Sequence, residues 1–460
     1  MSKDSSVLKR VLANAGTLLG GRSVNAVVGL AYIALTARGL GKEVMGVLVL
    51  INAFSQFLGE VAKFQSWQTL LQYGASALLQ GDRPRFQQVL RFTLLLDTLG
   101  AAVGVSLGVI GALAFGHLLG WPATLSPAAA CYALSIAVMD SATSVGLLRL
   151  FDRFRFLAAE QAVSSAVRLI GCALCFTLHA PIEGYLAAWA AGTVTAFIYV
   201  NGVALWDLNR RQLLKDFTVR GPLSKGLPGI WRFAWATNFS GTIDSAFSQV
   251  ITLVVGSVLG PAQAAMWRVG RQVADGMAKP AKLLVPALYP ELAKMRATGG
   301  EEAMRALSRQ IGLIGGAVAG VLLLISILFG DDVLTIVMGP AFAAGASIMN
   351  WQVAAAAIGV LAMPLEPMLV SLGKAGLALR VRAVVCAVYL VALVPLIRAV
   401  GLNGAGAALV GVAAALALGM YWALKRSLRA ELGPTAVPTP KPHKDEQTCA
   451  DTENGAKGVS

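Results

Sequence analysis

Apolar segments long enough to cross a lipid bilayer recur along the whole of this 460-residue chain, and they constrain its fold more than any other feature. A spanning helix needs about 20 predominantly apolar residues. Twelve segments meet this requirement: approximately 12–36, 44–64, 88–115, 125–148, 158–178, 184–206, 232–256, 264–290, 309–329, 344–371, 377–397 and 402–424. Only 13% of the residues are charged, about half the share of a soluble domain. The sequence therefore predicts an all-α polytopic membrane protein with about 12 transmembrane helices.

The positive charges between these segments fall almost entirely on one side of the predicted membrane. If all twelve segments cross, only Arg38, Lys42 and Arg398 lie in loops on the side opposite the N-terminus. Lys and Arg are enriched in cytoplasmic loops, so we expect both termini in the cytoplasm, including a disordered tail over 433–460 that is poor in apolar residues. The formal net charge of +14 thus indicates topology rather than nucleic-acid binding.

The chain contains one internal repeat, at an offset of roughly 212–219 residues. The matching features are Leu40-Gly41 with Leu259-Gly260, Tyr73 with Tyr289, and the glycine series Gly100, Gly104 and Gly108 with Gly312, Gly316 and Gly320. Two repeats of six spans share one orientation and are related by an axis along the membrane normal. We expect a six-helix lobe over 1–216 and a second over 217–432, enclosing a central site. This is the architecture of an alternating-access transporter.

Five cations near span ends, Arg91, Arg232, Arg309, Arg380 and Arg382, are counted with the cytoplasmic loops. Seven further cations fall within the predicted spans: Arg22, Lys63, Arg168, Arg268, Arg271, Lys279 and Lys282. A charge inside the membrane faces a watery cavity or a partner, because burial in lipid costs several kcal/mol, roughly 3 or more. Arg22 and Asn25 lie in a small and polar stretch of the first span, and Arg268 and Arg271 lie on one face of the eighth. Together with Lys279 these residues predict a basic cavity, in which the planar arginine side chains suit phosphate oxygens.

Acidic side chains within the spans allow two interpretations. Asp244, Asp275 and Glu366 are candidates for proton or ion coupling, because intramembrane carboxylates mark ion pathways. The alternative is structural pairing with intramembrane arginines. Asp275 follows Arg271 by four residues, the spacing of an ion pair along one helix face. Such a pair would produce a neutral stripe that holds helices together.

Signatures of catalysis are absent from the sequence. The three histidines, His117, His179 and His443, lie near span ends or in the tail, so none is placed to act as an intramembrane base or ligand. The chain lacks a P-loop motif, and we expect Cys172 and Cys175 to be small helix-packing residues rather than part of a zinc site, which takes four ligands. We expect no enzymatic activity, no metal and no cofactor.

Short motifs after two of the spans carry a resemblance to a known family. Asn14, the segment Ala37-Arg38-Gly39-Leu40-Gly41 and Gly46 resemble the opening of the polysaccharide-biosynthesis flippases. Pro286-Ala287-Leu288-Tyr289-Pro290-Glu291-Leu292-Ala293 resembles a later segment of the same family. The family belongs to the multidrug/oligosaccharidyl-lipid/polysaccharide exporter superfamily, whose members include the multidrug and toxic-compound extruders (MATE).

The resemblance implies a MATE-like fold and a function in the bacterial inner membrane. It implies translocation of an undecaprenyl-pyrophosphate-linked oligosaccharide between leaflets, for O-antigen, capsule or exopolysaccharide assembly. Arg22, Arg268 and Arg271 match the basic cavity in which family members are thought to hold the anionic headgroup. The implied partners are the lipid-linked oligosaccharide, membrane lipids and polysaccharide polymerase or ligase machinery.

Two other functions remain open at this point. A MATE-type drug or cation antiporter shares the twelve spans, but its cationic substrates favour an acidic cavity. A membrane polysaccharide polymerase or ligase needs catalytic groups at an outer surface, and the short predicted outer loops argue against it. The sign of the cavity charge therefore distinguishes the two transport functions.

Overall fold

The computed structural model describes residues 2–139, 141–218, 221–282, 300–371 and 374–431, and every regular element within these ranges is a helix. Side chains are described from residue 27 onward, except at 236, 239–247, 277–282, 300–315, 318–319, 367, 370–371, 375 and 428–431. The predicted tail over 433–460 lies outside the described residues. The prediction of an all-α chain is confirmed.

The first part of the chain forms long helices joined by short connections. They are α1 (Ser2–Ala62), α2 (Ser66–Thr69), η1 (Leu70–Gly74), α3 (Ala75–Leu79), α4 (Arg83–Phe115), η2 (Gly116–Leu119), η3 (Ala123–Leu125), α5 (Ser126–Ala133), α6 (Ile136–Met139), α7 (Ala142–Leu150), α8 (Phe154–Thr177) and α9 (Ile182–Arg210). Asp82 caps α4 by accepting a hydrogen bond from the Arg85 amide at 3.0 Å, which satisfies one of the free N–H groups of the first turn.

The second part repeats this pattern of long helices. They are α10 (Ile230–Leu259), α11 (Pro261–Lys282), α13 (Gly300–Met338), η4 (Pro340–Gly345), α14 (Ala346–Ala362), α15 (Leu365–Ser371), α16 (Ala375–Val400) and α17 (Leu402–Glu431). Pro364 precedes α15 and separates it from α14, so that one predicted span, 344–371, is broken into two helices.

Eight helical stretches among the described residues are long and apolar enough to cross a membrane, or nine if the bent pair 123–133 and 136–150 counts as one span. The sequence predicts twelve, and the difference has two sources. Two predicted spans, 12–36 and 44–64, fall under the one label α1 although Gly41 separates two helices within it. The side chains at 239–247 in α10 are not described, so of this helix only the short apolar stretch Ser248–Leu259 enters the count, and α11 carries several charged residues.

Two glycines predicted to be equivalent adopt nearly the same backbone conformation. Gly41 has φ 70° and ψ 172° and interrupts α1, whereas Gly260 has φ 93° and ψ 169° and separates α10 from α11. Residues with a Cβ avoid this region of backbone space, which glycine enters readily. The sequence match of Leu40-Gly41 with Leu259-Gly260 therefore corresponds to the same helix break in both parts of the chain.

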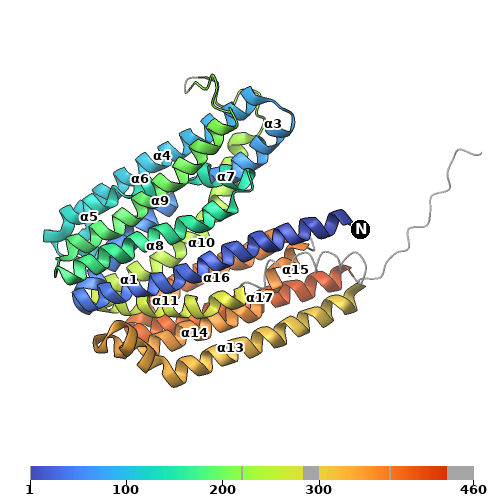
Figure 1. Cartoon of the computed structure of the whole chain (residues 1–460). Helices are drawn as coiled ribbons and strands as arrows, with labels where there is room; N and C mark the ends of the chain where they lie inside the picture. Colours follow the sequence, from blue (N-terminus) through green and yellow to red (C-terminus); the bar gives the residue numbers. More distant parts are fainter. Residues whose placement is uncertain (1, 140, 219–220, 283–299, 372–373, 432–460) are drawn as a thin grey trace, which may run out of the picture.

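The helices form two groups that diverge from a common end (Figure 1). One group contains α4 to α9 and the other contains α11 and α13 to α17, while α1 runs beside α11. The groups converge on the left of the view and separate toward the N-terminus on the right. The separated end carries the loops that the sequence predicts to be cytoplasmic.

Close backbone contacts hold the converging end together. A Cβ on Gly46 of α1 would lie 1.9 Å from the carbonyl oxygen of Pro261, and a Cβ on Gly256 would lie 2.2 Å from a methyl of Leu50. Only glycine allows the helices to approach this closely. The Arg38 guanidinium also donates a hydrogen bond to the Ile336 carbonyl near the end of α13. The converging end is thus closed by packing that involves both parts of the chain.

Helix α10 contacts both groups. Near its start, Trp231 and Trp235 make edge-to-face contacts with Phe92 and Phe64, at centroid distances of 4.9 and 5.2 Å. Near its end, Val255 belongs to a buried cluster that is otherwise formed by residues of the second part of the chain. The expected boundary between two lobes at residue 216 stays a prediction. With this boundary, α10 belongs to the second lobe and also contacts helices of the first.

Candidate functional site

Two cavities are lined in part by α11, each by different residues of this helix. The first, called the polar cavity, has a volume of about 420 Å³. It is lined by Gly29, Tyr32, Gln56, Val138, Met139, Ser141, Glu160, Gln161, Ser164, Ser165, Arg168, Thr193, Ala196, Phe197 and Gln272. The second, called the apolar cavity, has a volume of about 540 Å³ and is lined by residues of α11 and α14 to α17. Both volumes fall within the usual range of small-molecule sites, about 300–1000 Å³.

A stripe of polar residues on α8 forms one wall of the polar cavity. Glu160, Ser164 and Arg168 follow at intervals of four, and Gln161 and Ser165 continue the same face. Residues four apart lie above one another on a helix, so this face of α8 is polar from Glu160 to Arg168. The polar stripe of α8 therefore faces the polar cavity.

Arg168 is held in this cavity by residues of α1 and α9. Its Nη2 donates to Thr193 Oγ1 at 2.9 Å, and its guanidinium carbon lies 5.9 Å from the ring centroids of both Tyr32 and Trp189. Its Nε is buried without a hydrogen-bond partner. Aromatic faces attract a cation, so the two rings fix the orientation of the guanidinium while leaving one donor unused.

The two ends of helices α8 and α9 are joined by a further ion pair. Arg153 donates to both carboxylate oxygens of Asp207, at 2.7 and 2.9 Å, and the Asp207 side chain is only 1% exposed. The hydrogen bond to Asp207 raises the pKa of the Arg153 guanidinium above its ordinary value. This bidentate contact fixes the register in which α8 presents Arg168 to α9.

The apolar cavity contains two ion pairs among many aliphatic side chains. Arg271 Nε lies 3.2 Å from Asp275 Oδ2, and Arg382 Nη2 lies 2.6 Å from Glu366 Oε2. The aliphatic part of the lining is Ala274, Ala355, Ala356, Val360, Ala362, Met363, Leu409, Val412, Ala413, Leu416 and Met420. Two cations and two carboxylates compensate each other here, so the charged lining described for this cavity sums to zero.

Helix α11 separates the cavities by presenting different residues to each. Gln272 lines the polar cavity, and its Nε2 lies 3.1 Å from the position of a Cβ on Gly29. Arg271 and Asp275 line the apolar cavity. The helix therefore carries one polar uncharged face and one face with a charge pair.

The residues predicted from sequence are only partly brought together. Arg271, Asp275 and Glu366 all line the apolar cavity, and the pairing of Arg271 with Asp275, the alternative raised for these residues, is present. Arg268 is half-buried on α11 and close enough to the buried Tyr132 hydroxyl to interact with it electrostatically. Its role, like that of the other predicted site residues, stays a prediction.

Four of the predicted residues lie outside the described side chains. Arg22 and Asn25 belong to α1, Asp244 to α10 and Lys279 to α11. The described side chains alone therefore do not establish a basic cavity. Glu366 pairs with Arg382, a cation that the sequence pattern assigned to a cytoplasmic loop.

Sequence reasoning noted Arg168 as an intramembrane cation but did not select it for the site. The signal that marks it is the polar stripe of α8, in which Glu160, Ser164 and Arg168 recur every four residues. This signal was weaker than the cluster of charges on α11, because Arg168 has no charged neighbour within one helical turn. Its surroundings are supplied by other helices.

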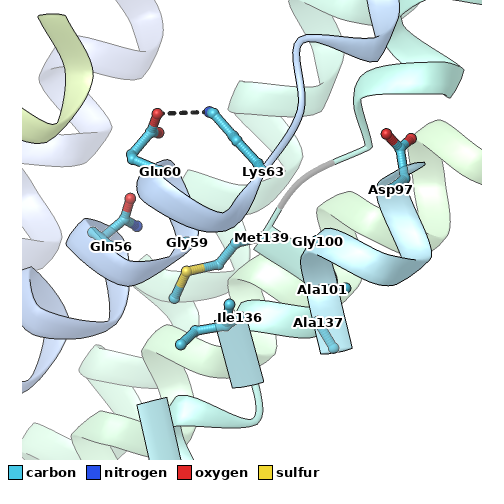
Figure 2. A pocket seen from close by; sticks show the side chains of 10 residues that line it. All are labelled: Gln56, Gly59, Glu60, Lys63, Asp97, Gly100, Ala101, Ile136, Ala137 and Met139. Carbon is cyan, nitrogen blue, oxygen red and sulfur yellow. Dashed lines mark ion pairs between the residues drawn. The ribbon is translucent and has the colours of Figure 1, made fainter. Parts of the chain in front are cut away.

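A third, much smaller cavity lies between α1, α4 and α6 (Figure 2). Its volume of about 40 Å³ suits a water molecule but is too small for a sugar or a phosphate group. Figure 2 shows Glu60 and Lys63 pointing toward each other, and they form an ion pair at 2.8 Å. Asp97 accepts a hydrogen bond from the Thr143 amide at 2.9 Å. These charges are engaged in local structure.

Comparisons with known proteins agree on the class of this chain. Residues 11–296 match the model of a family described as polysaccharide biosynthesis protein. The inner membrane protein YghQ of Escherichia coli (strain K12) is 29% identical over 338 residues, which are 72% of this chain and 93% of the relative. Among the described residues, no group of three or more His, Cys, Asp or Glu side chains is placed to hold a metal ion.

Solved structures with a similar fold are multidrug transporters. An inward-facing MATE family transporter of the MOP superfamily has a TM-score of 0.70 and 16% identity, covering 89% of this chain and 96% of that one. An outward-facing transporter with the same family description has a TM-score of 0.57 and 15% identity, covering 92% and 97%. The predicted MATE-like fold is confirmed.

Proposed function

The chain belongs to the polysaccharide biosynthesis protein family, and on that premise we propose that it moves an undecaprenyl-pyrophosphate-linked oligosaccharide across the bacterial inner membrane. It is a membrane transporter of the MOP superfamily, and its relative YghQ is an inner membrane protein. The proposed direction is from the cytoplasmic to the periplasmic leaflet. The product would supply O-antigen, capsule or exopolysaccharide assembly by polymerase or ligase machinery.

The observation that carries this proposal is the polar cavity. Its hydroxyl and amide side chains offer donors and acceptors for sugar hydroxyl groups, and Arg168 offers a cation for a phosphate. The apolar cavity, which also borders α11, offers an aliphatic surface, which suits a polyprenyl chain. The proposed substrate has a sugar head, a phosphate and a hydrocarbon tail. Each part thus has a matching set of side chains in the two cavities.

The arrangement of the helices supports alternating access. The two groups of helices diverge at the end where the sequence places its cytoplasmic cations (Figure 1). The TM-score is higher for the inward-facing transporter, 0.70, than for the outward-facing one, 0.57. We infer that the described conformation opens to the cytoplasm, with both termini on that side and twelve spans in two lobes.

Several residues keep the roles that the sequence suggested for them. Arg22, Asn25, Arg268 and Lys279 are proposed to contribute positive or polar groups to the substrate path. Asp244 is proposed to take part in ion coupling. Each of these roles is tested by replacing the residue with alanine. We expect Arg22→Ala to abolish surface polysaccharide while the protein still inserts into the membrane.

Arg271, Asp275 and Glu366 need a narrower proposal because each is paired. An ion pair that breaks and reforms during the transport cycle can take up a proton on its carboxylate. We propose this coupling role for Asp275 and Glu366. In this proposal Arg271 pairs alternately with Asp275 and with the substrate.

The cation antiporter is the competing function. It would require carboxylates available to a cationic drug, whereas Asp275 and Glu366 in the apolar cavity are each paired with an arginine. A polymerase or ligase is disfavoured by the transporter fold. The paired carboxylates of the apolar cavity thus argue against the antiporter, whereas the described lining of the polar cavity holds one carboxylate, Glu160, and one cation, Arg168.

Deletion of the gene and complementation on a plasmid test the function. We expect the deletion strain to lose surface polysaccharide and to accumulate undecaprenyl-pyrophosphate-linked oligosaccharide in the inner leaflet, with both effects reversed by the wild-type gene. Resistance to cationic drugs should be unchanged. Normal polysaccharide together with increased drug sensitivity would replace this proposal by the antiporter.

A further inference from the structure

Arg168 differs from the other described arginines that line a cavity, because no carboxylate among the described side chains pairs with it. Arg271 and Arg382 each form an ion pair. Arg168 instead contacts a hydroxyl and two aromatic rings. An uncompensated cation within a membrane span is costly, and α8 is one of the helices long and apolar enough to span. Arg168 therefore lines the polar cavity without a direct counter-ion among the described side chains, and the carboxylate of the same cavity, Glu160, stands eight residues away on α8.

The guanidinium still has hydrogen-bonding capacity toward such an anion. One Nη2 bond goes to Thr193 at 2.9 Å. The Nε is buried beside Gly192 of α9, so the donors left for a ligand are the remaining N–H groups of the two Nη atoms. Guanidinium presents its N–H groups as a planar fork that matches the spacing of phosphate or carboxylate oxygens. Since Tyr32 and Trp189 lie against the guanidinium at 5.9 Å, the fork is oriented before any ligand arrives.

Helix α9 leaves room for this side chain by means of a glycine. A Cβ on Gly192 would lie 2.5 Å from Arg168 Cγ and 2.8 Å from the Ser164 carbonyl oxygen. Real Cβ atoms do not approach other atoms this closely. The Arg168 side chain can therefore reach the cavity past α9 only because position 192 has no side chain.

A second cation lies in the same region but comes from the second part of the chain. The Tyr132 hydroxyl is buried and interacts electrostatically with both Arg168 of α8 and Arg268 of α11. It also donates to Asn52 Oδ1 at 2.8 Å, so its proton is already used. Tyr132 supplies no negative charge to balance these cations.

The rest of the polar cavity has the chemistry of a carbohydrate site. Ser164, Gln161 and Gln272 contribute hydroxyl and amide groups, and Glu160 contributes a carboxylate. Glu160 stands eight residues before Arg168, which is about 12 Å along a helix at roughly 1.5 Å per residue. One end of the cavity thus favours an anionic group and the other favours hydroxyl donors.

We propose that Arg168, together with Thr193 and the rings of Tyr32 and Trp189, forms an oxyanion-binding subsite at one end of the polar cavity. It binds a phosphate or carboxylate group that is attached to a sugar, and the sugar occupies the end lined by Glu160 and Gln161. The sugar part of this assignment rests on the proposed function; the oxyanion part rests on the described contacts alone.

Calorimetric binding to the full-length protein in phosphatidylcholine nanodiscs tests the subsite. The probes are inorganic pyrophosphate for a phosphate source, glucuronate for an acidic sugar and glucose as the uncharged comparison. We expect one of the two anions to bind more tightly than glucose, and we expect Arg168→Gln to weaken that binding by about tenfold or more, since a hydrogen bond to a charged group is lost.

Three further variants separate a binding role from a structural one. Arg155→Gln removes an exposed cation of the same helix and should leave anion binding unchanged. Arg168→Lys keeps the charge but loses the fork and should give intermediate binding. Thr193→Val keeps Arg168 itself, so this variant tests the site even if Arg168→Gln fails to fold. It should weaken anion binding by about twofold to tenfold.

The outcomes of this experiment are distinct. Arginine-dependent binding of pyrophosphate supports a phosphate group as the ligand, and arginine-dependent binding of glucuronate supports an acidic sugar. Equal anion binding by the wild-type protein, Arg168→Gln and Thr193→Val would overturn the subsite. The proposed flippase function is judged separately by the polysaccharide of the deletion strain, so either proposal can fail while the other stands.

Discussion

The polar and apolar cavities, lined by different residues of α11, satisfy their charged residues in different ways. In the apolar cavity each described arginine has a carboxylate within 3.2 Å. In the polar cavity Arg168 has aromatic rings, one hydroxyl and an unused N–H group. A paired cation is already neutralised, whereas an unpaired one has binding energy available for a ligand. The comparison indicates that the two cavities do different work during transport.

The difference also changes how intramembrane charges are interpreted. Arg271 and Arg168 both belong to long helices and both line cavities of similar size, about 540 and 420 Å³. Only the surroundings distinguish a cation that stabilises packing from one that recognises an anion. The following variants test whether this distinction holds, from the largest expected effect to the smallest.

The largest effect is expected from removing the unpaired cation. Arg168→Gln should reduce surface polysaccharide by about tenfold or more, because a charged hydrogen bond worth about 1.5–3 kcal/mol to the substrate is lost. The measurement is quantitative immunoblotting of surface polysaccharide in a complemented deletion strain. Arg155→Gln, which removes an exposed cation of α8, is the control and should complement fully.

If Arg168→Gln complemented as well as Arg155→Gln at equal membrane abundance, the polar cavity would lose its assigned role. Substrate recognition would then be assigned to the paired residues of the apolar cavity instead.

An intermediate effect is expected from filling the space beside Arg168. Gly192→Ala places a methyl group 2.5 Å from Arg168 Cγ, so the arginine or the helix pair must shift. Overpacking of this kind costs about 1–3 kcal/mol. We expect a lower thermal unfolding temperature in detergent and weaker anion binding. The matched control is Gly202→Ala on the same helix, where a Cβ meets nothing within 4 Å.

Unchanged stability in Gly192→Ala would mean that the two helices adjust without strain. Unchanged anion binding in the same variant would show that the position of the guanidinium is not critical, which contradicts the oriented fork inferred for the polar cavity.

The smallest effect on stability is expected from the ion pair between α15 and α16. The Glu366 and Arg382 side chains are 40% and 27% exposed, and pairs with this much solvent contribute only about 0.2–1 kcal/mol. The double variant Glu366→Gln with Arg382→Gln should therefore unfold within about 2 °C of the wild type, given the usual relation between free energy and melting temperature for a large protein.

The same double variant discriminates structural pairing from ion coupling. If Glu366 carries the coupling proton, transport is lost in both Glu366→Gln and the double variant, whereas a purely structural pair leaves the double variant active. Polysaccharide complementation provides the measurement, with Arg382→Gln alone as the reference for a released carboxylate.

Local sequence patterns predicted most of the helices. Each predicted span is marked by its own apolar composition, and breaks occur at residues such as Gly41 and Gly260, whose positive φ angles require glycine. The Arg271 to Asp275 pair was also foreseeable, because residues four apart on a helix are neighbours wherever the helix lies. These features depend on contacts within one or two helical turns.

The remaining site features were not foreseeable from the sequence. Arg382 and Glu366 are sixteen residues apart and meet only because α15 and α16 pack together. Arg168 was visible as a charge within a span, yet its lack of a carboxylate partner depends on what α1 and α9 place beside it. No pattern along α8 reports this.

The sequence by itself determined that this chain is a helical membrane protein, where its helices break and, through its motifs, which family it resembles. The tertiary structure decided which intramembrane charges are neutralised and which remain available. The physical reason is that apolar length and backbone preference act along the chain, whereas the energy of a charge depends on its distance through space to every other group. The spacing of Arg271 and Asp275 already indicated a paired cation, whereas only the packing of α1 and α9 around Arg168 shows that no carboxylate of another described helix pairs with it.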